Sequence, residues 1–110
     1  NIHKKIFDQE TVKKIEGMVA AVDHAYEAML ANLEAAHKGT LEEISNAYNA
    51  EDRINNLRNN LREAEIEELE SNRKNYHASV YYMDIVSELE KMGDFIINIS
   101  QTLEKSFVKK

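Results

Sequence analysis

Two pairs of oxygen-bearing side chains stand at a spacing that would let them hold a cation. Glu90 and Asp94 are four residues apart, and Glu51 and Asn55 repeat that spacing. Residues four apart share one face of a helix, so each pair would place two oxygen ligands side by side. Oxygen ligands of this kind suit hard cations and iron. We therefore take these four side chains as the candidate metal site.

Ordinary ion pairing is the alternative interpretation of the same residues. Arg58 and Lys91 could neutralise the carboxylates, which would leave a solvated helix face with salt bridges. Gly93 stands between Glu90 and Asp94 in the sequence, although glycine costs roughly 1 kcal/mol in a helix interior relative to alanine. A small residue there would let a neighbouring helix backbone approach closely, and we take close packing as its main role.

Other patterns that could carry chemistry are weaker. Glu34 and His37 have the Glu-x-x-His spacing of helical di-iron proteins, but such sites need two copies plus two further glutamates. Asn98-Ile99-Ser100 matches the glycosylation sequon but lies inside a predicted helix. The sequence contains no glycine-rich phosphate loop, nucleophile elbow or Ser/His/Asp arrangement. A helical metal-carboxylate oxidase is therefore disfavoured, and no enzyme activity is expected.

Composition limits the function classes further. The 110 residues suit one domain with one core, and the lack of proline and cysteine predicts an all-α protein without disulfides or thiolate sites. The net charge of -6 disfavours binding to nucleic acid or to an anionic membrane surface. No apolar run approaches the roughly 20 residues that span a bilayer. Because the first residue is Asn1, we expect residues 1–110 to be a single domain from a longer chain.

Breaks in the helical pattern predict three helices, at about 9–37, 41–70 and 75–108. Gly39 can end the first helix in a left-handed conformation. Thr40, followed three residues later by Glu43, is typical of a capping box that would begin the second helix. The polar stretch 70–75 separates the second helix from the third.

Each predicted helix carries an apolar stripe at spacings of three and four. Similar lengths and short connections favour antiparallel neighbours, and hence an elongated up-down-up three-helix bundle. One extended coiled coil is the alternative, which the break at Gly39 disfavours. The expected core residues are Val12, Ile15, Val19, Val22, Tyr26, Met29 and Leu33, then Ala47, Ala50, Ile54, Leu57, Leu61 and Ala64, flanked by Ile44, Tyr48 and Ile66, and finally Tyr82, Met83, Val86, Leu89, Gly93, Ile96, Ser100, Leu103 and Phe107.

One stretch of the third predicted helix resembles a family signature. Residues 85–94 read Ile-Val-Ser-Glu-Leu-Glu-Lys-Met-Gly-Asp, and residues 95–99 continue as Phe-Ile-Ile-Asn-Ile. This order is similar to the third-helix signature of PhoU-type domains, in which Leu-Glu, a basic residue, Ile or Met, and Gly-Asp are followed a turn later by Asn-Ile. Residues 51–57, Glu-Asp-Arg-Ile-Asn-Asn-Leu, resemble the second-helix motif of that family less closely.

The resemblance implies a PhoU-like (or spectrin-like) three-helix fold and a non-enzymatic role in regulating phosphate uptake. A single repeat implies similarity to the soluble C-terminal domain of bacterial sodium/phosphate cotransporters, and hence a cytoplasmic domain of an inner-membrane protein. The implied partners are the transporter's membrane domain or a sister PhoU-like domain, and a homodimer stays open. Nucleic acid and direct membrane insertion are not expected. The rival interpretation is a structural or dimerising bundle without a metal or phosphate role.

The resemblance also bears on the candidate metal site. Some members of the family bind iron or zinc clusters through Glu/Asp-x-x-x-Asp motifs on their second and third helices. Glu90 and Asp94 fit the third-helix motif, and Glu51 fits the first position of the second-helix motif. Asn55 stands where that motif has an aspartate, and an amide is a neutral and weaker ligand. The resemblance thus implies iron or zinc at these four residues, with one anionic ligand missing.

Overall fold

Three long helices make up the structure, a computed structural model that describes residues 7–71 and 76–108. They are α1 (Gln9–His37), α2 (Ser45–Glu70) and α3 (Tyr76–Phe107). All three contact one another, and the molecule measures 55 × 30 × 16 Å, so the predicted all-α class and elongated shape are confirmed. The predicted start of the third helix at residue 75 lies outside the described residues. None of the helices in the described ranges has an apolar stretch able to cross a bilayer.

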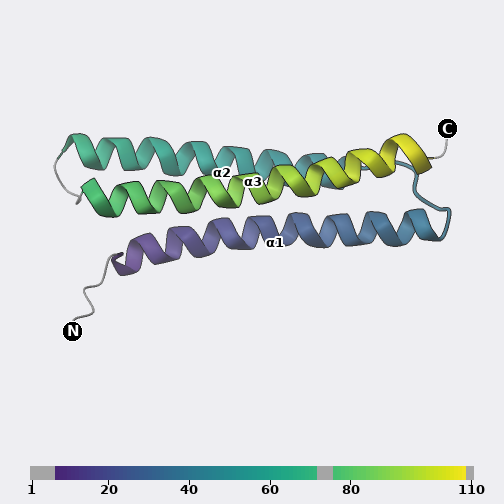
Figure 1. Cartoon of the computed structure of the whole chain (residues 1–110), viewed down its shortest axis with the longest axis horizontal. Coiled ribbons are helices and arrows are strands. Elements are labelled where there is room, and N and C mark those ends of the chain that lie inside the picture. The colour runs from purple at the N-terminus through teal and green to yellow at the C-terminus, as the bar shows by residue number, and fades with distance from the viewer. Residues whose placement is uncertain (1–6, 72–75, 109–110) are drawn as a thin grey trace.

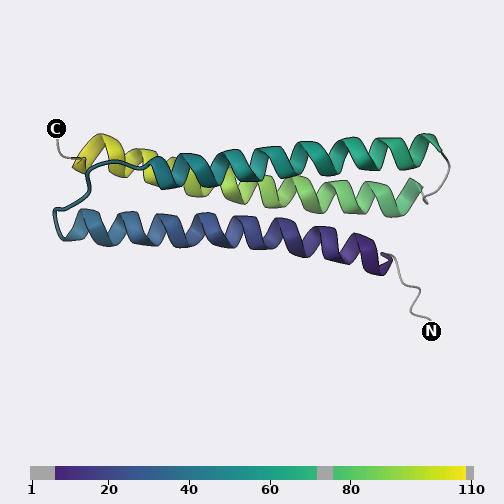
Figure 2. The ribbon, with the colours of Figure 1, turned by 180° about the vertical axis from the view of Figure 1, so that it is seen from behind.

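The helices lie side by side along their lengths. The colour gradient shows α1 and α3 running in the same direction and α2 running against them (Figure 1). From behind, the connection between α1 and α2 lies at the same end of the molecule as the C-terminal end of α3 (Figure 2). Contacts between α2 and α3 fit this arrangement, because residue numbers rise along α2 as they fall along α3: Tyr48 meets Glu104, Ile54 meets Gly93, and Glu65 meets Ser79.

The start of the second helix is not where the capping box placed it. Residues 40–44 are not helical, and α2 begins at Ser45, without a side-chain hydrogen bond from its N-cap, Ile44. Thr40 instead completes the end of α1, because its backbone N–H and its hydroxyl both donate to the carbonyl of Ala35. The non-helical segment buries Leu41 and Ile44 against the end of the bundle. Burial of these two side chains outweighs the local capping signal.

Gly39 ends α1 in the left-handed conformation that the sequence predicts, with φ of 72°. Its N–H donates to Ala36 and that of Thr40 to Ala35, which is the Schellman arrangement. A Cβ at Gly39 would meet nothing within 4 Å, so only backbone strain opposes a side chain there. We expect Gly39→Ala to lower the free energy of unfolding by about 1 kcal/mol in urea titrations, and Gly39→Asn to lower it less. A loss from asparagine as large as that from alanine would contradict this explanation.

The core follows the predicted stripes closely in α2 and α3 but only in part in α1, where Val22 and Met29 are buried as predicted. Buried positions of α1 include Met18, Ala25 and Asn32, each one residue before a predicted core residue. The predicted Val19, Tyr26 and Leu33 are instead 46%, 46% and 39% exposed. The buried residues and the predicted residues form two adjacent lines along α1. The buried line contains Ala21 and Ala25, whose small side chains let it lie closer to the other helices. Further differences are the exposed side chains of Tyr48, Ala64, Ile66 and Phe107, and the buried side chain of Glu65.

Candidate functional site

The candidate site forms where α3 comes closest to α2. Gly93 is buried in α3, and a Cβ built on it would lie 2.8 Å from Cδ1 of Ile54 in α2. That separation is shorter than the 3.5–4.0 Å at which carbon atoms normally rest. Gly93 therefore leaves room for the buried side chain of Ile54, whereas the close approach of a helix backbone that the sequence predicted is not seen among the atoms nearest to that Cβ. This packing of α3 on α2 brings the polar residues that flank Gly93 and Ile54 toward each other.

Glu90 is paired with a cation from the facing helix. Its carboxylate forms a salt bridge with the guanidinium of Arg58, and the two side chains are 18% and 21% exposed. Lys91 points to a different partner, since its Nζ lies 3.2 Å from the carboxylate of Glu88 on the same helix. The ion-pair interpretation thus holds for Glu90 through Arg58. A carboxylate already bound to a guanidinium has its charge compensated without a metal.

The second carboxylate of α3 lies near a carboxylate of α2. The pKa of Glu51 is raised, first because the side chain is partly buried and then because Asp94 and Asp52 repel its negative charge. Asp94 is exposed, whereas Asn55, one turn after Glu51, is partly buried. Asp94 of α3 thus lies close enough to Glu51 of α2 for its charge to be felt, while Glu90 is engaged by Arg58.

These donors do not fit an iron or zinc cluster in this arrangement. Across residues 7–71 and 76–108, no group of three or more His, Asp or Glu side chains could hold a metal ion. A multinuclear cluster needs several anionic ligands, and here one position is an asparagine and a second is bound to arginine. The metal site stays a prediction, and no step of the function proposed below is routed through a metal.

Repulsion at Glu51 predicts a pH-dependent gain in stability when its charge is removed. The folded state raises this pKa above the ordinary 4.5, so ionisation of Glu51 disfavours the folded state as pH rises above that value. We expect Glu51→Gln to raise the free energy of unfolding at pH 7 by about 0.3–0.5 kcal/mol. The gain should shrink toward zero below about pH 4, where both states are protonated. Urea titrations at the two pH values, with exposed Glu42→Gln as control, test this; an equal gain at both would refute it.

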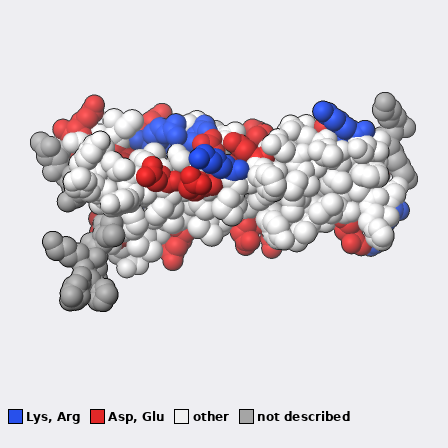
Figure 3. Space-filling model, viewed as in Figure 1, with Lys and Arg blue, Asp and Glu red and all other residues white. Residues whose placement is uncertain are grey.

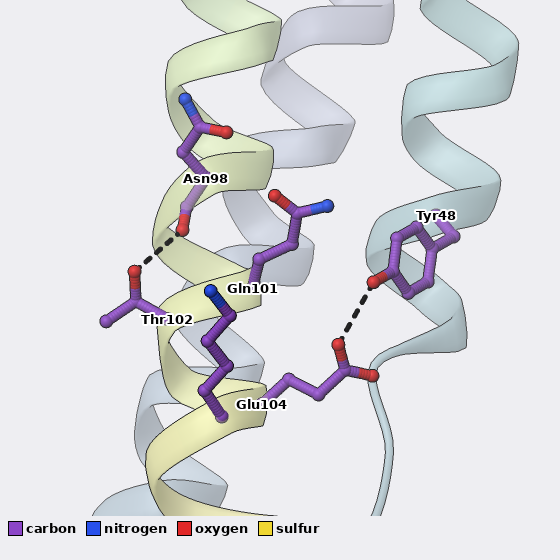
Figure 4. A pocket seen from close by; sticks show the side chains of 6 residues that line it. Tyr48, Asn98, Gln101, Thr102 and Glu104 are labelled. Carbon is purple, nitrogen blue, oxygen red and sulfur yellow. Dashed lines mark hydrogen bonds between the residues drawn. The ribbon is translucent and has the colours of Figure 1, made fainter.

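A polar pocket of about 380 Å³ opens beside the first turn of α2 and the last turns of α3. Tyr48 donates a hydrogen bond to the carboxylate of Glu104 at 3.0 Å, and Thr102 donates to the backbone carbonyl of Asn98 (Figure 4). Gln101 extends from α3 on the side of the pocket that faces Tyr48. The sequence did not single out this pocket, because its residues come from two helices that are distant in the chain and form no recognised motif.

The remaining sequence candidates do not converge on a site. Glu34 forms a salt bridge with Lys38 at 3.3 Å, and His37 is the exposed last residue of α1. In the sequon, Asn98 is exposed but Ser100 is fully buried in the middle of α3. A glycosylation enzyme needs the sequon in an accessible, extended chain, so this match has no functional meaning.

A buried polar cluster between α2 and α3 was missed by sequence reasoning. Ser79 donates a hydrogen bond to Glu65, and both side chains are almost fully buried. Nearby Tyr82 is also buried, and burial, followed by the charges of Glu65 and Glu68, raises its pKa to about 12. The signal was present, because Glu65 continues the core line of α2 four residues after Leu61. The acidic composition of residues 62–70 concealed it.

Comparison with known protein families places a PhoU domain on residues 18–103. The match spans parts of all three helices and includes both candidate pairs on α2 and α3. The chain belongs to the PhoU family. No curated protein and no solved structure gave a significant match. Membership of this non-catalytic regulatory family indicates a phosphate-related regulatory role for the PhoU domain described here.

Proposed function

We propose that this PhoU domain is a non-enzymatic regulatory part of a sodium-dependent phosphate transporter. It would control phosphate uptake by contact with the transporter's membrane domain or with a sister PhoU-like domain, on the cytoplasmic side of the inner membrane. The family match over residues 18–103 supports the phosphate-related regulatory part of the proposal, and the transporter is the part that the deletion experiment tests. The ordered Leu89 to Asp94 motif, built into the contact between α3 and α2, also supports the regulatory part.

The geometry of the site favours regulation by protein contact over chemistry. Glu90 is held by Arg58, and Gly93 is covered by Ile54, so the motif joins two helices. A motif that fixes the spacing of α2 and α3 would keep the outer faces of the bundle in a defined arrangement. Those faces carry exposed aromatic side chains, including Tyr26, Tyr81 and Phe95, which suit recognition of another protein.

Deletion of the domain from its native chain tests the proposal. Phosphate uptake, followed with radiolabelled phosphate, should persist in the deleted strain but lose its difference between phosphate-replete and phosphate-starved cells. The matched control is the intact chain at equal expression. Uptake that responds to phosphate supply equally with and without the domain would reject a regulatory role. A purely structural module would instead lower the amount of transporter without altering its response.

Metal analysis separates the regulatory proposal from a cluster-dependent one. We expect the purified domain, after loading with iron or zinc and removal of the excess, to retain much less than one metal per chain. The physical reason is the Arg58–Glu90 salt bridge together with the neutral Asn55. Stoichiometric metal that is lost in both Glu90→Ala and Asp94→Ala would overturn this expectation and establish the site predicted from the sequence.

A further inference from the structure

An apolar groove runs between α1 and α3 on the outside of the bundle. Two adjoining hollows of about 240 and 370 Å³ lie along it and share Tyr26, Met92 and Ile96 in their walls. Val19 lines one hollow and Phe95 the other. Met92 and Phe95 are 53% and 68% exposed, which is unusual for large apolar side chains that stand next to each other.

The α1 side of this groove has the spacing of a helix-packing seam. Val19, Asp23 and Tyr26 line the groove, and Leu30 and Leu33 continue the same line beyond it at intervals of four and three; all five are exposed. This is the repeat with which helices present side chains to a neighbouring helix. This exposed line lies beside the buried residues of α1, so the apolar surface of the helix is wider than its contacts with α2 and α3 require. The part of that surface left exposed could pack against one additional helix.

The rim of the groove is acidic. Asp23 lines one of its hollows, and Glu16 and Glu27 share the helix face of Asp23, at seven residues before it and four after it. Glu34, eleven residues after Asp23, lies on the same face and is paired with Lys38. Residues 16–34 contain no lysine or arginine. In the space-filling view, acidic side chains follow the α1 edge while uncharged side chains cover much of the surface between α1 and α3 (Figure 3). On α3, the charge of Lys91 is paired with Glu88.

We propose that the α1–α3 groove binds an amphipathic helix of a partner protein, with an apolar face flanked by lysine or arginine. The apolar face covers Tyr26, Met92 and Phe95, and the flanking cations lie against Asp23, Glu27 and the other rim carboxylates. Docking of this kind completes a four-helix arrangement over the seam of α1. The inference rests on the proposed function in one respect, since it names the surface through which a regulatory contact is made.

Charge favours this partner over a second copy of the chain. Two copies facing through the same groove would bring the acidic rims of both α1 helices together, and like charges at an interface are unfavourable. The exposed apolar side chains of the groove offer on the order of 400 Å² in total, taking about 150–200 Å² for each whole side chain. They are Val19, Tyr26, Met92 and Phe95. A standard dimer interface buries about 800 Å² on each partner, of which a little over half, about 450 Å², is apolar. The apolar area of the groove therefore does not distinguish a helix from a second copy, and the charge of the rim decides between them.

Binding of synthetic helical peptides to the purified chain tests the groove directly. The probe is a peptide of about 20 residues with leucines at the seam spacing and lysines on both flanks, and its matched control has glutamates in place of the lysines. Fluorescence anisotropy should show the lysine peptide binding at least about tenfold more tightly. Equal affinity for the two peptides would overturn the proposal.

Matched variants locate the binding on the protein. Phe95→Ala should lower the affinity for the lysine peptide at least about tenfold. Phe107→Ala, which removes another exposed phenylalanine of α3, should leave that affinity unchanged. The double variant Asp23→Asn, Glu27→Gln should lower the affinity for the lysine peptide several-fold. The control double variant on α2, Glu63→Gln with Glu67→Gln, should lower it less. Equal losses from Phe95→Ala and Phe107→Ala would show non-specific adhesion and reject the groove.

Sedimentation of the chain without peptide tests whether a second copy of the chain occupies the groove instead. The chain should sediment as a monomer up to about 100 μM, because two copies facing through the groove would bring their acidic rims together. A dimer that Phe95→Ala dissolves would overturn the proposal in favour of a second copy. These measurements need no phosphate, so they are independent of the deletion experiment. If the peptide binds but the domain does not control phosphate uptake in cells, only the proposed function is rejected. If the domain controls uptake but the peptide does not bind, only the proposed role of the groove is rejected.

Discussion

Gly93→Ala should destabilise the wild-type protein but stabilise a protein that already carries Ile54→Val. Alanine is favoured over glycine in a helix by about 1 kcal/mol. In the wild type, however, the new Cβ would lie 2.8 Å from Cδ1 of Ile54, which is itself almost fully buried. Overpacking of this kind costs about 1–3 kcal/mol, so a net loss near 1 kcal/mol is expected. Ile54→Val removes that one methyl group and leaves the next atom, Cγ2, at an ordinary 3.5 Å.

A double-mutant cycle followed by urea denaturation measures the effect. The coupling between the two changes should be about 2 kcal/mol, larger than additivity errors between distant sites. Gly17→Ala provides the control, because Gly17 is an exposed glycine in α1 at which a new Cβ would meet no atom within 4 Å. It should raise the free energy of unfolding by about 0.5–1 kcal/mol in both backgrounds. If Gly93→Ala stabilises the wild type as Gly17→Ala does, close packing does not explain the glycine.

The same contact links packing to electrostatics at the candidate site. Burial of Glu51, followed by the charges of Asp94 and Asp52, raises its pKa, and Gly93 stands next to Asp94 where α3 packs on Ile54 of α2. A larger residue at position 93 should separate the helices and lower the pKa of Glu51 toward its ordinary value. The wild-type stability gain from Glu51→Gln should then be smaller in a Gly93→Val background, although that background is itself less stable.

The helices and their main breaks could be predicted from the sequence because they depend on local signals. Gly39 ends α1 through its backbone conformation, and the apolar stripes of α2 and α3 match their buried faces. In α1 the pattern admits two adjacent lines, and the sequence alone favoured the more apolar one. The structure buries the line with Ala21, Ala25 and Asn32, because small side chains permit closer packing and Asn32 donates to Asn46 at 3.2 Å. Packing against the other helices, which no local pattern encodes, decides between the lines.

The candidate site could be predicted only in part for a related reason. Spacing within one helix placed Glu90 and Asp94 on a shared face, but it did not determine what each would meet across the interface. The register between α2 and α3 puts Arg58 opposite Glu90, and Glu51 near Asp94. The same register places Ile54 against Gly93, so apolar packing and the charge pattern of the site depend on one alignment of the two helices.

Ser79→Ala and Ser100→Ala should have opposite effects on stability, although both serines are buried on the core face of α3. Ser79 donates a hydrogen bond to the buried carboxylate of Glu65. Its removal leaves a charged acceptor without one donor, which costs about 1–3 kcal/mol. The hydroxyl of Ser100 has no hydrogen-bond partner among the described residues. Its replacement by alanine should be neutral or stabilising by about 0.5 kcal/mol, through helix propensity.

Thermal and urea denaturation of the two variants decide between a hydrogen-bond effect and a cavity effect. Both substitutions remove one oxygen atom from a fully buried position, so the cavities they leave are closely matched. Equal losses would assign the cost to lost packing and contradict the role given to Glu65. A third variant refines the assignment, because hydrogen bonds to charged acceptors are about twice as strong as neutral ones. In a Glu65→Gln background the cost of Ser79→Ala should therefore fall to about half, since glutamine keeps an acceptor but removes the charge that the serine hydroxyl stabilises.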